Sequence, residues 1–327
     1  QEIVESVQYG NIPDTWTNTD IGSFSRTVKL YDYQENAVKN AIKGLWLYYE
    51  QNVDWAPNEP KDANLERKNK LFEQYVVNGL KNEDYLITEK NGNFPILEKA
   101  FTVKDKSIQY SNLINRMSFW MATGSGKTLV IIKMIEVLGN LIKNQEIPEN
   151  DILLLIPRDD LIGQLKREVQ EYNQNTLGKK INLVSLKNYS QEKFSNKFAF
   201  ENEVTVFYYR ADNLSDAQKD AQIDYRNYDN NGKWYVFLDE AHKGSNDDSK
   251  MQAYCSVLAR SGFLFNFSAT LIDKEDLATT VYNYNLKEYI SHGYGKHILL
   301  SDQEFENFNE NDLNDTQKKE IVIRSLI

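Results

Sequence analysis

Cysteine and histidine are scarce in this sequence. The 327 residues include one cysteine, Cys255, and three histidines. A single cysteine excludes a disulfide within the chain, which agrees with a reducing compartment. Structural zinc sites are built from thiolate and imidazole ligands, so none is expected here. Because Cys255 lies in an apolar helical stretch, we expect a buried thiol there and not a nucleophile.

Long apolar runs and an excess of positive charge are also absent. No apolar run approaches the ~18 residues of a membrane span, and the polar start at Gln1 and Glu2 does not resemble a signal peptide. The 48 acidic residues outnumber the 38 basic ones, which gives a net charge of −10. This balance argues against a surface coated with basic side chains, but it is compatible with a local basic track. We therefore expect a cytoplasmic protein that does not bind a membrane.

The most informative stretch that is present is Met121-Ala-Thr-Gly-Ser-Gly-Lys-Thr128. An apolar run at residues 117–120 precedes it, and a helical pattern at residues 129–142 follows it. Strand, glycine-bearing loop, Gly-Lys-Thr and helix is the order of a phosphate-binding loop. The general pattern has glycine where this chain has Met121, so we expect a working loop with a differently shaped entrance. A chance glycine-rich turn is the alternative.

The residue types in this loop suit a phosphate ligand. Gly124 and Gly126 allow the backbone to turn its N–H groups inward, where they and the positive end of the next helix face an anion. Lys127 can reach the β- and γ-phosphates, and the Thr128 hydroxyl can bind Mg²⁺. The sequence thus predicts ATP and Mg²⁺ as cofactors. The predicted nucleotide-binding residues of the loop are Thr123, Gly124, Ser125, Gly126, Lys127 and Thr128.

Apolar strands alternate with helical patterns after this loop. The expected strands are 151–157, 181–186, 204–209, 234–238 and 263–267, and the expected helices are 161–172 and 249–260. Such alternation predicts an α/β fold with a mostly parallel sheet and helices on both faces. Ligands of such sheets bind at the carboxyl ends of the strands. The phosphate loop and the polar residues that directly follow other strands should therefore meet at one edge.

One of these strand ends carries an acidic pair. Asp239 and Glu240 follow the apolar strand 234–238. Asp239 is suited to hold Mg²⁺, and Glu240 is suited to orient or deprotonate a water molecule, because phosphoryl transfer depends mainly on positioning and charge neutralisation. A solvated acidic turn is the alternative. Together with Lys127, these two carboxylates are the predicted catalytic residues, and Thr128 and Asp239 are the predicted metal ligands.

The chain resembles the superfamily 2 helicases. Ala122-Thr-Gly-Ser-Gly-Lys-Thr128, Asp239-Glu-Ala-His242 and Ser268-Ala-Thr270 occur in the order of their motifs I, II and III. Leu30-Tyr-Asp-Tyr-Gln34 is similar to their glutamine motif, and Pro157-Arg158 is similar to motif Ia. The resemblance implies the first RecA-like motor lobe of an ATP-driven helicase. Three strings within residues 121–128, 265–271 and 282–294 look most like the restriction subunit of type III restriction enzymes.

The resemblance also implies roles for single residues. Gln34 would bond the adenine edge, and Arg158 would contact a nucleic-acid phosphate. His242, Ser268 and Thr270 would couple the nucleotide state to the nucleic acid. Each role has an alternative. Gln34 could be an ordinary polar helix residue, Arg158 a surface charge, His242 a buried histidine, and Ser268 and Thr270 the polar end of a strand.

The expected organisation is an arm, a lobe and a linker. Residues 1–26 are the N-terminal arm, residues 27–285 the motor lobe with an insertion at about 51–110, and residues 286–327 a linker. We expect the first helix to begin with Asp32 as its N-cap and Glu35 as a capping-box partner. The linker would lead to a second RecA-like lobe of a longer polypeptide, so this chain alone should hydrolyse ATP poorly. We interpret the insertion as a surface elaboration rather than a DNA-contacting module.

The function predicted from these features is an ATP-dependent DNA translocase or helicase lobe of a restriction or anti-phage enzyme. Its partners would be duplex DNA, the second lobe and a modification or specificity subunit. An RNA helicase lobe, and a nucleotide-dependent switch or scaffold that does not translocate, are the alternatives. The sequence leaves open the recognition sequence, the strand polarity, the oligomeric state and whether DNA is cut.

Overall fold

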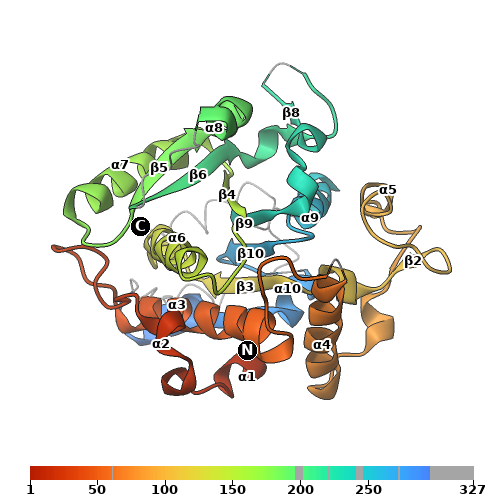
Figure 1. Cartoon of the computed structure of the whole chain (residues 1–327), viewed down its shortest axis with the longest axis horizontal. Coiled ribbons are helices and arrows are strands. Elements are labelled where there is room, and N and C mark those ends of the chain that lie inside the picture. Colours follow the sequence, from red (N-terminus) through yellow and green to blue (C-terminus); the bar gives the residue numbers. More distant parts are fainter. Residues whose placement is uncertain (61, 196–201, 220, 241–245, 272, 295–327) are drawn as a thin grey trace, which may run out of the picture. The chain divides into compact units, whose positions relative to one another are not determined.

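Seven parallel strands form the centre of the larger of two structural units (Figure 1). The computed structural model describes residues 1–60, 62–195, 202–219, 221–240, 246–271 and 273–294. The larger unit is Gln1–Asn285 and the smaller is Leu286–Ile327, whose described part contains helix α11 (Leu286–Ser291). Most of the expected linker, residues 295–327, lies outside the described residues.

The strand order is β11-β3-β10-β9-β4-β6-β5, and every pair is parallel. The strands are β3 (Arg116–Met121), β4 (Asp151–Ile156), β5 (Lys180–Ser185), β6 (Glu203–Arg210), β9 (Trp234–Asp239), β10 (Phe263–Ser268) and β11 (Thr280–Tyr284). The central strands are continuous apolar runs because both of their faces are covered. The sheet confirms the predicted α/β fold class.

The long helices cover both faces of the sheet (Figure 1). Helices α3 (Asp32–Trp46), α6 (Lys127–Lys143) and α7 (Asp159–Asn175) contact one another on one face, and α9 (Asn246–Leu258) packs against β9 on the other. Shorter helices and two small sheets surround this core. The short elements are α1 (Glu2–Glu5), α2 (Asp14–Thr17), α5 (Phe94–Leu97), α8 (Tyr189–Ser195), α10 (Lys274–Ala278), β1 (Ile87–Thr88), β2 (Ser107–Ile108), β7 (Leu214–Ser215) and β8 (Ile223–Asp224). The inserted segment adds one long helix, α4 (Ala63–Val77).

The start of α3 differs from the prediction. Tyr31, with extended backbone, is the N-cap, and Asp32 is the first helical residue. The side-chain oxygen of Gln34 accepts a hydrogen bond from the Tyr31 N–H at 3.0 Å, whereas Glu35 pairs with Lys39. The predicted Asp32–Glu35 cap is therefore wrong by one residue. A glutamine three residues after the cap satisfies the same orphan donor as a glutamate would.

Residues 1–26 are held against α6 by a buried lysine. The Lys133 ammonium donates to the carbonyl oxygens of Asp20 at 3.1 Å and Ser23 at 2.6 Å, and it forms an ion pair with Glu136 at 2.7 Å. The Trp16 side chain is also fully buried. A buried ammonium is tolerated when its donors are used in this way, so the N-terminal segment is part of the packed unit.

Two buried basic side chains on α4 hold the inserted segment, residues 51–110, together and tie it to the lobe. Arg67 is 1% exposed and forms an ion pair with Glu59 at 2.5 Å. The Lys68 ammonium donates to the carbonyl oxygens of Asn112 at 2.7 Å and Arg260 at 2.8 Å. Burial lowers the pKa of Lys68 to about 7. Lys68 thus anchors to the lobe a segment that was expected to be a surface elaboration.

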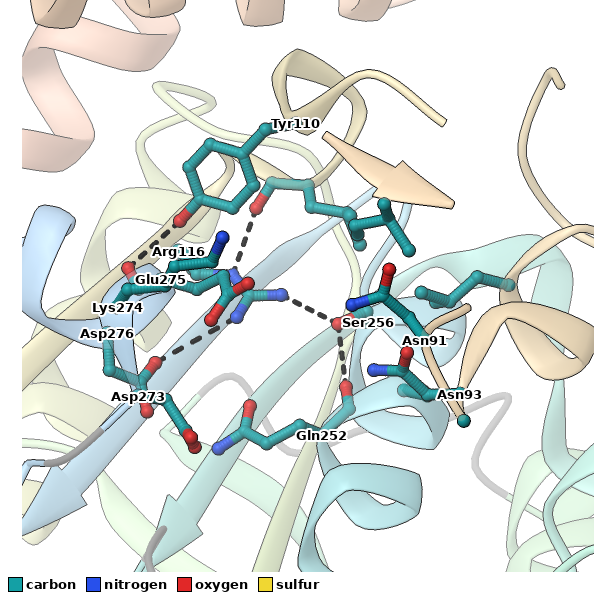
Figure 2. Close-up of a pocket in the computed structure, with 15 residues that line it drawn as sticks. Asn91, Asn93, Tyr110, Arg116, Gln252, Ser256, Asp273, Lys274, Glu275 and Asp276 are labelled. Carbon is teal, nitrogen blue, oxygen red and sulfur yellow. Dashed lines mark hydrogen bonds and ion pairs between the residues drawn. The ribbon is translucent and has the colours of Figure 1, made fainter. Parts of the chain in front are cut away.

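A cavity of about 460 Å³ lies between this segment and helices α9 and α10 (Figure 2). Asn91 and Asn93 line it from the inserted segment, and Ser256 lines it from α9. The Arg116 guanidinium lies at its wall, where Nη2 donates to Ser256 Oγ at 2.7 Å. Polar groups therefore line a large part of the boundary between the insertion and the sheet.

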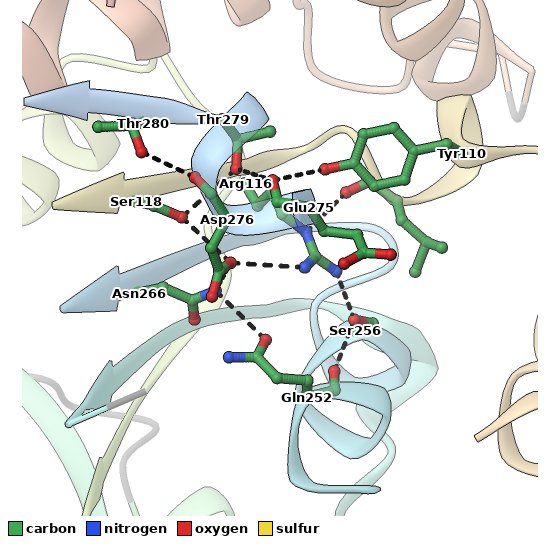
Figure 3. A network of polar contacts seen from close by, with 11 residues as sticks. Tyr110, Arg116, Ser118, Gln252, Ser256, Asn266, Glu275, Asp276, Thr279 and Thr280 are labelled. Carbon is green, nitrogen blue, oxygen red and sulfur yellow. Dashed lines mark hydrogen bonds and ion pairs between the residues drawn. The ribbon is translucent and has the colours of Figure 1, made fainter. Parts of the chain in front are cut away.

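Arg116 also belongs to a buried polar network beside strands β3 and β10 (Figure 3). Asp276 is 3% exposed and lies 3.8 Å from the guanidinium of Arg116. It accepts hydrogen bonds from Ser118 Oγ at 3.1 Å and Asn266 Nδ2 at 2.6 Å. Burial raises the pKa of Asp276, and the charge of Arg116 opposes that rise. The network joins β3 and β10, the two strands that lead to the phosphate loop and to Ser268.

Candidate active site

The phosphate loop connects β3 to α6 and depends on two left-handed glycines. Gly124 has φ +81° and Gly126, the N-cap of α6, has φ +78°. A Cβ at Gly126 would lie 2.4 Å from Gln34 Nε2, so no side chain fits there. Helix α6 has 17 residues. The first N–H groups of a helix have no partner within the helix, which makes its start suited to an anion. The loop and the N-terminal end of α6 are thus suited to bind phosphate.

Gln34 lies directly behind this loop. Its side chain is 2% exposed. Its Nε2 donates to the Ser125 carbonyl oxygen at 2.9 Å, while its Oε1 accepts from Tyr31 N. Both ends of the amide are thus engaged within the chain, and adenine recognition by Gln34 stays a prediction.

Lys127 is the first residue of α6 and is largely buried. Its Nζ lies 3.1 Å from Glu240 Oε1, with side-chain exposures of 9% and 27%. This ion pair joins the phosphate loop to the end of β9, so the structure brings two of the predicted catalytic residues together. An ammonium in this position has three donors, and one carboxylate oxygen does not use them all.

The acidic pair ends strand β9 in a strained turn. Glu240 has φ +54°, a left-handed conformation that non-glycine residues adopt at a cost. Its N–H donates to Asp239 Oδ1 at 3.1 Å. Burial, and then the charge of Glu240, raise the pKa of Asp239 to about 6, while Lys127 opposes the rise. Strain and a raised pKa at one strand end are features that cluster at functional sites.

Strand β10 brings Ser268 next to this pair. Phe267 is in register with Asp239, so Ser268 lies one residue beyond it at the same edge. Ser268 Oγ donates to the Thr270 carbonyl oxygen at 2.7 Å and accepts from the Thr270 N–H at 2.9 Å. The Trp120 indole donates to the Ala269 carbonyl oxygen at 2.8 Å. These bonds fix the segment to β3 and to itself, and the coupling role of Ser268 and Thr270 stays a prediction.

Arg158 lies at the same carboxyl edge but at the surface. It is the N-cap of α7, and its side chain is 62% exposed and 3.4 Å from Asp160. An exposed pair of this kind contributes little to stability and leaves the guanidinium accessible. His242 lies outside the described residues. The roles of both residues therefore stay predictions.

No group of three or more acidic, histidine or cysteine side chains within the described ranges could hold a metal ion. Metal binding by Thr128 and Asp239 stays a prediction. At phosphate sites Mg²⁺ usually uses one or two carboxylates together with phosphate oxygens. In the same ranges, no helix has the length and apolar content to span a bilayer.

Comparison with known proteins identifies the family of this chain. A family model described as "Type III restriction enzyme, res subunit" matches residues 27–273, which span both the phosphate loop and the acidic pair. The chain belongs to the Res subunit family. Membership supports an ATP-dependent, helicase-like domain. No curated protein sequence matches the chain. Among solved structures, the UvsW helicase from bacteriophage T4 shows a low similarity, with 14% identity over 77% of this chain and 78% of that chain and a TM-score of 0.29.

Two features of this Res-family site were missed in the sequence. Glu168 on α7 adds negative charge near Asp239, since its carboxylate is among the groups that raise the pKa of Asp239. Burial raises the pKa of Glu168 itself. Tyr33 donates its hydroxyl to the Ser125 carbonyl oxygen at 3.0 Å. No motif marks Glu168, whereas the position of Tyr33 next to Gln34 was an available signal.

Proposed function

We propose that this chain is the ATP-binding first motor lobe of a DNA translocase or helicase from a restriction or anti-phage enzyme. The observation that carries the proposal is the Lys127–Glu240 ion pair of 3.1 Å, because it joins the phosphate loop to the acidic pair. ATP hydrolysis needs a cation that binds phosphate and a carboxylate that positions water. Here the two candidate groups are in direct contact. Membership of the Res subunit family supports a restriction context.

The residues around the loop fit a magnesium–nucleotide ligand. Gly124 and Gly126 have the left-handed backbone that lets N–H groups line a phosphate cradle. Thr128 and Asp239 offer the hard oxygen ligands that Mg²⁺ prefers. When bound, the ion supplies charge neutralisation at the phosphate oxygens.

Lys127 and Glu240 would change partners during a cycle. In this structure, Lys127 and Glu240 neutralise each other across 3.1 Å. A triphosphate offers Lys127 a second set of anionic oxygens, which weakens its hold on Glu240. The carboxylate of Glu240 can then orient a water molecule and accept its proton. Asp239, whose pKa is about 6, would be mainly ionised at pH 7.5 and able to bind a cation.

The proposal extends to the parts of the protein and its partners. We propose residues 1–26 as an arm, residues 27–285 as the motor lobe and residues 286–327 as a linker to a second RecA-like lobe. Duplex DNA would be the nucleic acid, with Arg158 contacting a phosphate, and a modification or specificity subunit would supply site recognition. Such an enzyme would act in the cytoplasm.

The test is ATP hydrolysis by the native polypeptide, alone and with duplex DNA or single-stranded RNA, beside Lys127→Ala. We expect duplex DNA to stimulate hydrolysis, and we expect Lys127→Ala to abolish it. Stimulation by RNA alone would replace DNA with RNA as the substrate. Hydrolysis that neither nucleic acid changes would overturn the motor and favour a nucleotide-dependent switch.

A further inference from the structure

The Ser125 carbonyl group in the phosphate loop accepts two hydrogen bonds from α3. The Tyr33 hydroxyl donates at 3.0 Å and Gln34 Nε2 donates at 2.9 Å. Both donor side chains are buried, with exposures of 7% and 2%. Two buried donors on one backbone oxygen hold that oxygen in one direction, because losing either would leave a polar group unsatisfied.

The direction of this carbonyl decides the direction of the next N–H. Ser125 C=O and Gly126 N–H belong to the same planar trans peptide, so they point in opposite directions. With the carbonyl turned toward α3, the Gly126 N–H is turned away from α3. A glycine with φ +78° has wide conformational freedom, so its own backbone does not hold that orientation.

Tyr33 is itself held by Tyr284 of the edge strand β11. The two rings stack with centroids 4.4 Å apart and an angle of 7° between their planes. The Tyr284 carbonyl oxygen also accepts a hydrogen bond from Ala122 N, at the start of the loop, at 3.0 Å. The start and the middle of the phosphate loop are thus tied to the same pair of tyrosines.

We propose that Tyr33 and Tyr284 are positioning residues that orient the Ser125–Gly126 peptide for phosphate before the nucleotide arrives. This inference deepens the proposed function and rests on ATP binding at this loop. Neither tyrosine needs to touch the nucleotide. Preorganisation of this kind lowers the cost of binding and therefore acts on affinity.

The test is Tyr33→Phe, which keeps the ring and its stacking on Tyr284 but removes one donor to Ser125. The matched control is Tyr235→Phe, because the Tyr235 hydroxyl is buried and donates to the Pro148 carbonyl oxygen at 2.9 Å, at the opposite end of the sheet. Both variants lose a single tyrosine-to-carbonyl hydrogen bond. A general loss of stability would therefore appear in both.

We expect Tyr33→Phe to raise the Kd for ATP, measured by calorimetry without nucleic acid, by about 3- to 10-fold. The KM for ATP should rise by a similar factor with kcat within about twofold, and Tyr235→Phe should leave both constants unchanged. Equal ATP affinity in Tyr33→Phe and wild type would overturn the positioning role. So would an equal loss in Tyr235→Phe. Because binding is measured without nucleic acid, a failure of DNA stimulation would count against the motor and not against this inference.

Discussion

The substitution Asp239→Asn tests how much an ionised Asp239 lowers the stability of the folded protein. The native pKa of about 6 lies about two units above the ordinary aspartate value of 3.8. At ~1.4 kcal/mol per unit, ionising Asp239 in the native state costs up to ~3 kcal/mol. Because Asp239 is half-buried and water screens part of the field, we expect ~1–3 kcal/mol.

The sign of the pH dependence follows from proton binding. Between pH 3.8 and about 6, the native state holds the Asp239 proton more tightly than the unfolded chain does. The contribution of Asp239 to stability is therefore present below pH 3.8 and is lost as the pH rises through 6. Asparagine cannot ionise, and its side-chain oxygen can still accept the bond from Glu240 N. The variant should thus gain stability relative to wild type across this range.

The assay is urea unfolding of both proteins at pH 5 and pH 7.5 without nucleotide. Asp239→Asn should be more stable than wild type by ~1–3 kcal/mol at pH 7.5, with a smaller gain at pH 5. Adding magnesium and ATP should stabilise wild type and have little effect on the variant, because the variant lacks the carboxylate that we propose binds the cation. A variant that is no more stable than wild type at pH 7.5 would refute this reasoning.

Three further predictions concern charges elsewhere in the protein. Arg116→Met should destabilise the protein by ~3 kcal/mol in urea unfolding because it leaves Asp276 buried without its cation, and adding Asp276→Asn should restore much of the loss. Between pH 6.5 and 9, the free energy of unfolding of wild type should rise by ~2 kcal/mol relative to that of Lys68→Met. The reason is that the native state releases the Lys68 proton near pH 7, whereas the unfolded chain holds it to about pH 10.5. Parallel stability profiles of the two proteins against pH would contradict this. Arg158→Ala should weaken nucleic-acid binding equally for all sequences and lower the salt slope by about 1, which a titration at several salt concentrations would measure.

The fold was predictable because its signal is local. Strand β9 is an unbroken apolar run, and a glycine-bearing loop followed by Gly-Lys-Thr marks the end of β3. The carboxyl ends of parallel strands meet at one edge, so the contact between Lys127 and Glu240 follows from their places after two such strands.

The buried cations could not be predicted because their partners are distant in the sequence. Lys68 donates to the backbone oxygen of Arg260, 192 residues away. Periodicity places charged residues on the solvent face, since their burial is rare unless they are paired. Tyr33 differs, because its place next to Gln34 was an available signal even though its partner oxygen belongs to Ser125, 92 residues further on.

The measurement that tests the account most directly compares Glu240→Gln with wild type in ATP binding and in single-turnover hydrolysis. The substitution removes the carboxylate that we propose orients water, and it also releases Lys127 from its ion pair. The account predicts that Glu240→Gln binds ATP at least as tightly as wild type and hydrolyses it at least about 100-fold more slowly. Hydrolysis at the wild-type rate would contradict a catalytic role for Glu240 at this site.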